Sequence, residues 1–279
     1  MKYLALLLFS TLLTFKEASS QMQYRDLYSN LAYYENTPAD MDTTLCFRCR
    51  LDLYLPPDTT GFATIIWFHG GGLTQGNKEI PSTLKNRGIA VVGAGYRLNP
   101  AVKAPLYIQD AAAAVAWVFR HIAEFGGDPE LIFLSGHSAG GYLASMVGLD
   151  LMWLERFSVD GNRIAGLIPL SGHTITHFTA RAERGIPGER AVVDSLAPLY
   201  HVRADAPPML LITGDRELEM LGRYEENAYL MRMMRVSGHT ANSLLELQGY
   251  GHNMVDPALP ILLREVQRLT RLKKTNKSM

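Results

Sequence analysis

Cysteine is scarce in this sequence. The 279 residues contain two cysteines, Cys46 and Cys49, in the run CFRC. A small scaffold stapled by disulfides is excluded, and a single domain of this length buries about three quarters of its unfolded surface without such staples. Positions three apart in an alternating strand point to opposite faces, which disfavours a disulfide between them. One CxxC without a second pair or a nearby histidine is weak evidence for zinc. We expect two packed cysteines, and the sequence leaves their oxidation state open.

The chain also lacks an excess of charge of either sign. Lys and Arg total 27, as do Asp and Glu, so the formal net charge is zero. Nucleic-acid binding usually needs a broad basic field, so we expect no nucleic-acid partner. The composition is 47% hydrophobic and 19% charged, which is typical of a globular protein and argues against disorder or a coiled coil.

Long apolar runs are missing beyond the N-terminus, so we expect no membrane span, which would need about 20 apolar residues. The N-terminus combines a positive charge at Lys2, an apolar stretch over 3–15 and small residues at 18–20. This pattern predicts a cleavable signal peptide over 1–20 and a mature domain over 21–279, with an uncleaved anchor or a buried helix as the alternative. We expect a secreted or periplasmic protein.

Short apolar runs alternate with helical stretches from about residue 46 onward. This alternation predicts a single α/β domain with a mostly parallel central sheet and helices on both faces. Expected strands are 48–55, 63–68, 89–94, 131–135, 164–170, 209–213 and 243–247, and expected helices are 105–125, 139–149, 225–236 and 257–271. The stretch 173–203, rich in Gly, Pro, Arg and Glu, fits this alternation poorly. Long irregular insertions are usually functional or disordered, and we expect this one to lie over the active face, with its mobility as a lid left open.

The strongest chemical motif is GHSAG, residues 136–140. It follows the apolar run LIFLS directly and opens a helical stretch. A sharp strand-to-helix turn strains Ser138 and projects its hydroxyl clear of the sheet, while the flanking glycines let the backbone pass closely. Ser138 is therefore the candidate nucleophile. A phosphate-binding turn with a capping serine is the alternative.

A second glycine-rich turn, HGGG at 69–72, follows the apolar run ATIIWF. Acyl transfer creates a tetrahedral oxyanion, which backbone N–H groups stabilise. We predict an oxyanion hole formed by the N–H groups of Gly71, Gly72 and Ala139. His69 is expected to hold this loop and not to act as a base.

HGGG at 69–72, GYRLNP at 95–100 and FGGDPELIFLSGHSAGGYLA at 125–144 together resemble the α/β-hydrolase fold. More narrowly, the chain resembles the esterase/lipase group that includes hormone-sensitive-lipase-like carboxylesterases, bacterial feruloyl and acetyl-xylan esterases, and kynurenine formamidases. The resemblance is dense over 51–149 and thinner to about residue 256. The chain differs from members with a large N-terminal cap, and the 173–203 insertion is the candidate replacement for part of it.

The resemblance implies the chain order nucleophile, acid, base, and its histidine falls on His252, in a Gly-His pair after the run SLLEL. His137 is expected to leave the turn in another direction from Ser138, His121 lies in a helix and His239 in a turn. We expect no metal and no organic cofactor.

His173 and His177 stand four residues apart, as a metal-binding pair would. They lack the intervening Glu of HExxH, so a substrate-lining or solvent-facing role is expected for both.

The acid is sought in GDRELE, residues 214–219, after the run MLLIT. Related sequences commonly place Asp three residues after the glycine, where this chain has Glu217. Glutamate can orient the imidazole and stabilise its cation as aspartate does. We predict Glu217 as the acid, with Asp215 as the alternative and Glu219 as a third candidate.

These features predict a secreted serine carboxylesterase that hydrolyses short-chain acyl esters through an acyl-enzyme. The resemblance suggests acetyl or feruloyl esters of plant polysaccharide as substrates. The charged run RAERGIPGER within the insertion does not match the apolar lid of a long-chain lipase. An arylformamidase or amidase on the same triad, and a catalytically inactive binding protein, are the alternatives. The acyl and alcohol specificity and the oligomeric state are left open.

Overall fold

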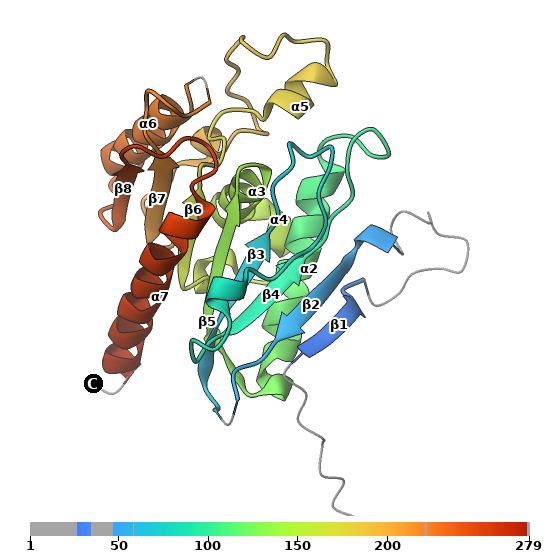
Figure 1. The fold of residues 1–279 in the computed structure, drawn as a ribbon, viewed down its shortest axis with the longest axis vertical. Coiled ribbons are helices and arrows are strands. Elements are labelled where there is room, and N and C mark those ends of the chain that lie inside the picture. Colours follow the sequence, from blue (N-terminus) through green and yellow to red (C-terminus); the bar gives the residue numbers. More distant parts are fainter. Residues whose placement is uncertain (1–26, 35–46, 58, 221, 278–279) are drawn as a thin grey trace, which may run out of the picture.

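A computed structural model describes residues 27–34, 47–57, 59–220 and 222–277 of the chain (Figure 1). The expected signal peptide and Cys46 lie outside the described residues. Eight strands in the described part form one sheet in the order β1-β2-β4-β3-β5-β6-β7-β8. Their bounds are β1 Leu27–Ala32, β2 Arg50–Tyr54, β3 Phe62–Phe68, β4 Ala90–Ala94, β5 Gly127–His137, β6 Gly166–Leu170, β7 Met209–Gly214 and β8 Asn242–Leu247.

The sheet is mostly parallel, as the sequence predicts. Strands β4, β3, β5, β6, β7 and β8 pair in parallel, whereas β2 runs antiparallel to both β1 and β4. Strands β3, β4 and β6 are buried along their whole length, which is why they read as continuous apolar runs. Strand β1 is mostly exposed, and its sequence LYSNLA is not a continuous apolar run, so the sequence does not predict it.

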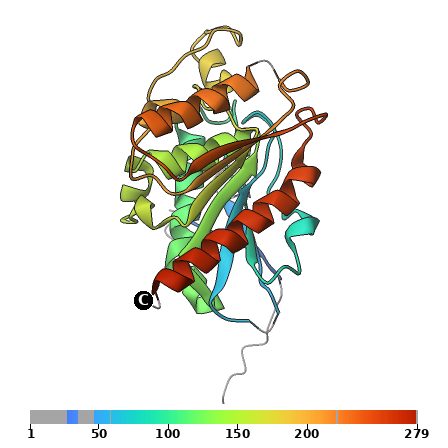
Figure 2. The ribbon, with the colours of Figure 1, turned by 90° about the vertical axis from the view of Figure 1, so that its left-hand side faces the viewer.

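Helices cover both faces of the sheet. Their bounds are α2 Leu106–His121, α3 Ala139–Leu149, α4 Met152–Glu155, α5 Phe178–Ala182, α6 Arg223–Val236 and α7 Val255–Lys277. One apolar core joins the sheet to α2, α3 and α6, and a second joins its other face to α7. Figure 2 shows α7 crossing this second face diagonally. Alternate residues of β3 enter the two cores, Ile66 the first and Ile65 the second, as the two-residue period of a strand requires.

Several element boundaries differ from the expected ones: β5 begins at Gly127 and not at 131, and α7 extends to Lys277 and not to 271. The helix expected over 105–125 is α2 followed by a 3₁₀ turn at 122–125, which Gly126 ends with a φ of 89°. Strand β2 begins at Arg50, after a helical turn at 47–48. Cys49, between them, is a free thiol, and burial raises its pKa. The thiol is therefore kept protonated and packs into the first apolar core.

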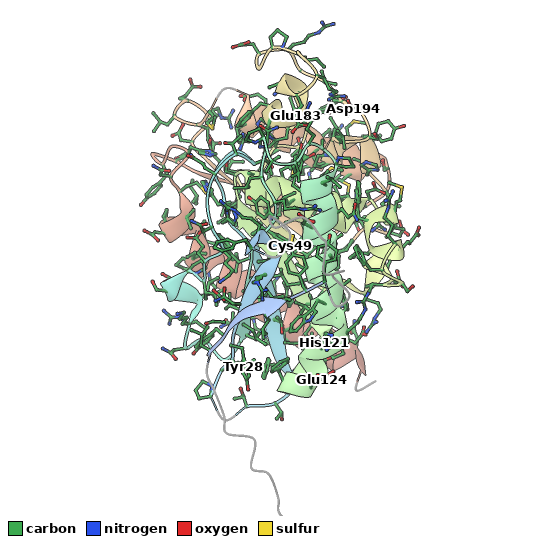
Figure 3. The ribbon with its side chains drawn as sticks, turned by 90° about the vertical axis from the view of Figure 1, so that its right-hand side faces the viewer. Tyr28, Cys49, His121, Glu124, Glu183 and Asp194 are labelled. Atoms are coloured by element: carbon green, nitrogen blue, oxygen red, sulfur yellow. The ribbon has the colours of Figure 1, made fainter. Side chains whose placement is uncertain are left out.

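The 173–203 insertion contains α5 and a 3₁₀ turn at 198–201. Glu183 accepts hydrogen bonds from the Asn99 side chain at 3.0 Å and from the Ala104 amide at 2.8 Å, and Arg184 pairs with Asp194 at 2.7 Å. Glu183 and Asp194 lie at the end of the molecule opposite to His121 (Figure 3). The insertion is thus tied to the loop after β4. No described helix is both long enough and apolar enough to cross a bilayer.

A buried ion pair fixes the loop after β4. The Arg97 guanidinium donates two hydrogen bonds to Asp110 of α2, at 2.7 and 2.8 Å, and the Arg97 amide donates one at 3.0 Å. The Tyr34 hydroxyl donates a fourth at 2.8 Å. The side chain of Asp110 is fully buried and that of Arg97 is 8% exposed. Neighbouring Tyr96 donates to the His69 carbonyl at 2.7 Å, so this loop supports the HGGG turn.

We predict that Asp110→Asn lowers the free energy of unfolding by about 3–5 kcal/mol, because it leaves the Arg97 guanidinium buried without its carboxylate. Urea unfolding measures this change. The control Glu265→Gln removes an ion pair with the half-exposed Arg268 on α7, and a loss under about 0.5 kcal/mol is expected there. Equal losses in the two variants would contradict the structural role of Asp110.

Candidate active site

Five loops meet at the carboxyl ends of β3, β5, β6, β7 and β8. They carry the HGGG turn, Ser138, Ser171, Glu219 and His252 respectively. The carboxyl ends of parallel strands lie at one edge of a sheet, which is where α/β proteins place their sites.

Ser138 lies in the sharp turn that the motif predicts. Its φ is 56° and its ψ is −115°, a region that side chains other than glycine rarely occupy. The turn is held by a hydrogen bond of 2.9 Å from the Ser138 amide to the Leu170 carbonyl. A Cβ on Gly140 would lie 1.9 Å from the Phe68 carbonyl oxygen. Glycine at 140 is therefore required for β3 and the start of α3 to approach each other.

His252 connects Ser138 to a carboxylate. Its Nε2 lies 2.9 Å from Ser138 Oγ, and its Nδ1 lies 2.9 Å from Glu219 Oε2. With Glu219 ionised, Nδ1–H donates to the carboxylate, and Nε2 is then free to accept the Ser138 proton. The structure thus brings together the predicted serine and histidine with the third of the three acid candidates.

The Glu219 carboxylate is fully buried and surrounded by donors. Besides His252, it accepts hydrogen bonds from the Ser171 hydroxyl, from the Gly214 amide at 3.1 Å and from the Met220 amide at 3.0 Å. Burial alone would raise the pKa of Glu219, but the hydrogen bonds from His252, Ser171 and Met220 lower it to about 2. The carboxylate therefore stays ionised at neutral pH.

The prediction of Glu217 as the acid is corrected by this geometry, as is the alternative Asp215. Glu217 is exposed to solvent. Asp215 accepts from the Glu217 amide at 3.0 Å and from the Gly249 amide at 2.9 Å, so it ties the β7 loop to the loop that precedes His252. The amides of residues 218 and 219 both bond to the Asp215 carbonyl. This extra turn brings Glu219, five residues after Gly214, back over the end of β7.

Ser171 is a site residue that the sequence analysis did not single out. It follows β6 with a φ of 47°, and its Oγ donates to Glu219 and lies 3.1 Å from His252 Nδ1. The sequence signal that could have found it is the Ser-Gly pair at 171–172, which directly follows the apolar run of β6. Strand β6 lies beside β5, and Ser138 follows β5.

The HGGG turn lies against Ser138. A Cβ on Gly70 would be 3.6 Å from the Ser138 Cβ, and Gly71 and Gly72 have φ values of 109° and 63°. Within the described residues, the amides of Gly71 and Gly72 donate no hydrogen bond. The Ala139 amide, first in α3, has no partner inside the helix, as at any helix N-terminus. These three N–H groups are therefore available to a ligand.

Two histidines support the site without acting as its base. The His69 ring stacks on Tyr96 at 4.3 Å, and burial lowers the pKa of His69 to about 4. His137 donates from Nε2 to the His252 carbonyl at 2.8 Å, and burial lowers its pKa to about 4 as well. Both rings are neutral at pH 7, and His137 fixes the backbone that carries His252.

His173 and His177 lie in the buried floor of the insertion. His173 Nδ1 donates to Glu226 at 2.9 Å, and the two rings meet edge to face at 4.9 Å. Among the residues that the structure describes, no group of three or more His, Cys, Asp and Glu side chains converges as a metal site would require.

A cavity of about 870 Å³ borders the site. Phe178 of α5 lines it and also contacts the HGGG turn, where a Cβ on Gly72 would lie 3.1 Å from its ring. Met220, next to Glu219, also lines it. The cavity therefore has room for part of a small substrate beside the Ser138–His252–Glu219 group.

Comparison with known proteins shows similarity to esterases. A family model described as BD-FAE matches residues 51–162. Over 192 residues the chain is 33% identical to the probable carboxylic ester hydrolase LipM of Mycobacterium tuberculosis, covering 59% of this chain and 44% of LipM. These matches make the chain similar to carboxylic ester hydrolases and support an α/β-hydrolase esterase family.

Two solved structures share the fold. A truncated carbohydrate esterase from gut microbiota superposes with a TM-score of 0.74 at 19% identity, covering 90% of this chain and 99% of that one. Propionate-bound esterase Est2 of Thermogutta terrifontis superposes with a TM-score of 0.60 at 25% identity, covering 74% of this chain and 80% of that one. The predicted α/β-hydrolase fold is thereby confirmed. The chain spans less than half the length of the first curated relatives that it matches.

We predict that Glu219→Gln lowers kcat on p-nitrophenyl acetate by about 10³–10⁴-fold, because an amide favours the wrong imidazole tautomer and cannot stabilise the imidazolium. The matched control is Glu217→Gln, two residues away and exposed, for which kcat near the wild-type value is expected. A large loss in the Glu217 variant and none in the Glu219 variant would show that the acid is misassigned.

The depressed pKa of Glu219 also predicts a pH dependence of stability. Its folded-state pKa of about 2 lies below the ordinary 4.5, so its stabilisation is complete above pH 4.5 and is lost as the pH falls toward 2. The difference in free energy of unfolding between wild type and Glu219→Gln should therefore shrink by up to about 3 kcal/mol over this range. Urea titrations at several pH values measure it, and a constant difference would contradict the prediction.

Proposed function

We propose that the protein is a serine carboxylesterase acting on short-chain acyl esters. The observation that carries this proposal is the chain of hydrogen bonds from Ser138 through His252 to Glu219, with 2.9 Å at each step. Nucleophile, base and orienting carboxylate at hydrogen-bond distance are the parts that acyl transfer to a serine requires. Curated relatives named as ester hydrolases support the same reaction.

The first half of the reaction forms an acyl-enzyme. Ser138 Oγ attacks the ester carbonyl while His252 Nε2 takes its proton, and Glu219 stabilises the resulting imidazolium. The N–H groups of Gly71, Gly72 and Ala139 receive the developing oxyanion, each donor contributing about 3–4 kcal/mol. Collapse of the tetrahedral intermediate breaks the ester bond, and His252 returns the proton to the leaving alcohol.

The second half frees the enzyme. His252 takes a proton from a water molecule, whose oxygen attacks the acyl carbon. A second oxyanion forms in the same set of N–H groups, and its collapse releases the carboxylic acid and reprotonates Ser138. The strained backbone of Ser138 serves both steps, because it holds Oγ at the helix N-terminus, where negative charge is favoured.

The proposal also includes that the acyl chains are short and that the enzyme is exported. The Est2 structure with bound propionate supports a small acyl group, and so does the polar content of the insertion, where Thr174, Thr176, Thr179 and Arg181 are buried. The predicted signal peptide supports a secreted or periplasmic enzyme. The resemblance to feruloyl and acetyl-xylan esterases supports acetyl or feruloyl groups of polysaccharide as substrates.

The test compares the purified chain with Ser138→Ala on p-nitrophenyl acetate, a longer-chain homologue, acetylated xylan and methyl ferulate. We expect hydrolysis that is fastest on short acyl groups and falls to background in the variant. We also expect an acyl adduct on Ser138 in rapid-quench mass spectrometry. A folded protein with no Ser138-dependent turnover of any ester would contradict the proposal, and turnover of formamides or amides alone would identify an amidase.

A further inference from the structure

The cavity beside the site is built by two segments that are far apart in the sequence. One wall is the insertion, with His173, Phe178 and Arg181, and the other is the start of α6 with Arg223. Figures 1 and 2 both show α5 and α6 at the same end of the molecule. Because Arg223 donates to the Ser171 carbonyl, this wall is joined directly to the residue that contacts Glu219 and His252.

Two arginines line this cavity while being almost completely buried. Arg181 is 3% exposed and Arg223 is 1% exposed. Guanidinium groups are rarely buried to this degree without a partner carboxylate. Within the described residues neither of them forms an ion pair. Burial lowers the pKa of both side chains, because a charged guanidinium group loses its contact with water there.

Each guanidinium group donates from Nη1 and leaves the same other edge without a partner among the described residues. Nη1 of Arg181 donates to the Arg190 carbonyl, and Nη1 of Arg223 donates to the Ser171 carbonyl. Among the described residues, Nε of each is buried without a partner, and Nη2 of each donates no hydrogen bond. The Nε and Nη2 edge is the one that binds a carboxylate through two parallel hydrogen bonds.

Nearby glutamates do not fill these positions. Glu226, whose negative charge raises the pKa of both arginines, already accepts hydrogen bonds from His173 Nδ1 at 2.9 Å and from the Thr174 amide at 2.9 Å. Glu189 and Glu225 also line the cavity but are exposed, so water screens their charge. The buried part of the cavity therefore has more unsatisfied donors than acceptors.

We propose that this cavity binds a carboxylate carried by the substrate, so that the preferred ester has an acidic group on its acyl or alcohol part. The proposal rests on the esterase function proposed above. Ile175, Phe178, Met220 and Tyr229 supply apolar walls, which suit a short hydrocarbon spacer between the ester and the acid. The substrate class is thus a short ester with one free carboxylate.

The test uses two pairs of esters that differ in one charge. The acyl pair is p-nitrophenyl hemiglutarate and p-nitrophenyl valerate, and the alcohol pair is 4-acetoxybenzoate and 4-acetoxybenzamide. The quantity compared is the ratio of kcat/KM for the acidic member to that for the neutral member. This ratio cancels any general effect of a substitution on the chemistry.

Arg181→Gln and Arg223→Gln are the test variants, and Arg184→Gln is the matched control. Arg184 also lies in the insertion and loses the same charge, but its side chain is 40% exposed and pairs with Asp194. Arg181→Gln keeps the proposal testable if Arg223→Gln, which also loses the bond to Ser171, fails to fold.

We expect wild type to favour the acidic member of at least one pair. In Arg181→Gln and Arg223→Gln the ratio should fall by about 10- to 100-fold, the effect of losing a charge-assisted hydrogen bond, and Arg184→Gln should keep the wild-type ratio. Ester turnover with the same ratio in all four proteins would overturn the carboxylate site and leave the proposed function standing.

Absence of Ser138-dependent turnover on all four esters would contradict the proposed function. Binding of monomethyl glutarate and methyl valerate to Ser138→Ala, measured by calorimetry, then tests the cavity alone. The carboxylate site is supported if monomethyl glutarate binds more tightly than methyl valerate and if this difference is lost on adding Arg181→Gln. Equal binding of the two esters overturns it.

Discussion

The buried carboxylate of Glu219 is the interaction on which the candidate site depends. Its two oxygens accept hydrogen bonds from His252, the Ser171 hydroxyl and two backbone amides. These donors come from the ends of β6, β7 and β8 and the loops that follow them, so one ionised group holds three strand ends together. The number of donors offsets the cost of burying the charge, and the result is an imidazole whose Nε2 faces Ser138.

The glycines at the same edge of the sheet impose a second constraint. A Cβ on Gly140 would collide with the Phe68 carbonyl, and one on Gly71 would lie 2.1 Å from the Gln75 carbonyl oxygen. Because these two positions have no side chain, the HGGG turn and the start of α3 can lie close together. The free amides and the strained Ser138 are therefore neighbours. Close packing of backbone, and not any one side chain, makes the anion-binding position.

The sequence predicted most of the parallel sheet and its helices, because strands buried on both faces appear as continuous apolar runs. Ser138 was predictable because its motif follows such a run directly, and His252 because the resemblance places the histidine after the last strand, here β8. Glu219 was not, since the choice rested on a fixed count of residues after Gly214, and only the hydrogen bonds to the Asp215 carbonyl show that the loop takes another turn. Strand β1 and Ser171 lacked a signal in hydrophobic periodicity.

Two histidine–glutamate pairs lie close together in this structure, and their surroundings separate their chemistry. His252 is 24% exposed with Ser138 at its free nitrogen, whereas His173 is 7% exposed and its Nε2 has no partner within the described residues. Burial raises the pKa of Glu226, while the additional donors lower that of Glu219. The first pair can therefore carry a proton to and from Ser138. The second keeps its imidazole neutral and its carboxylate hydrogen-bonded to other groups. Among the described residues, the neighbouring guanidinium groups of Arg181 and Arg223 therefore form no ion pair.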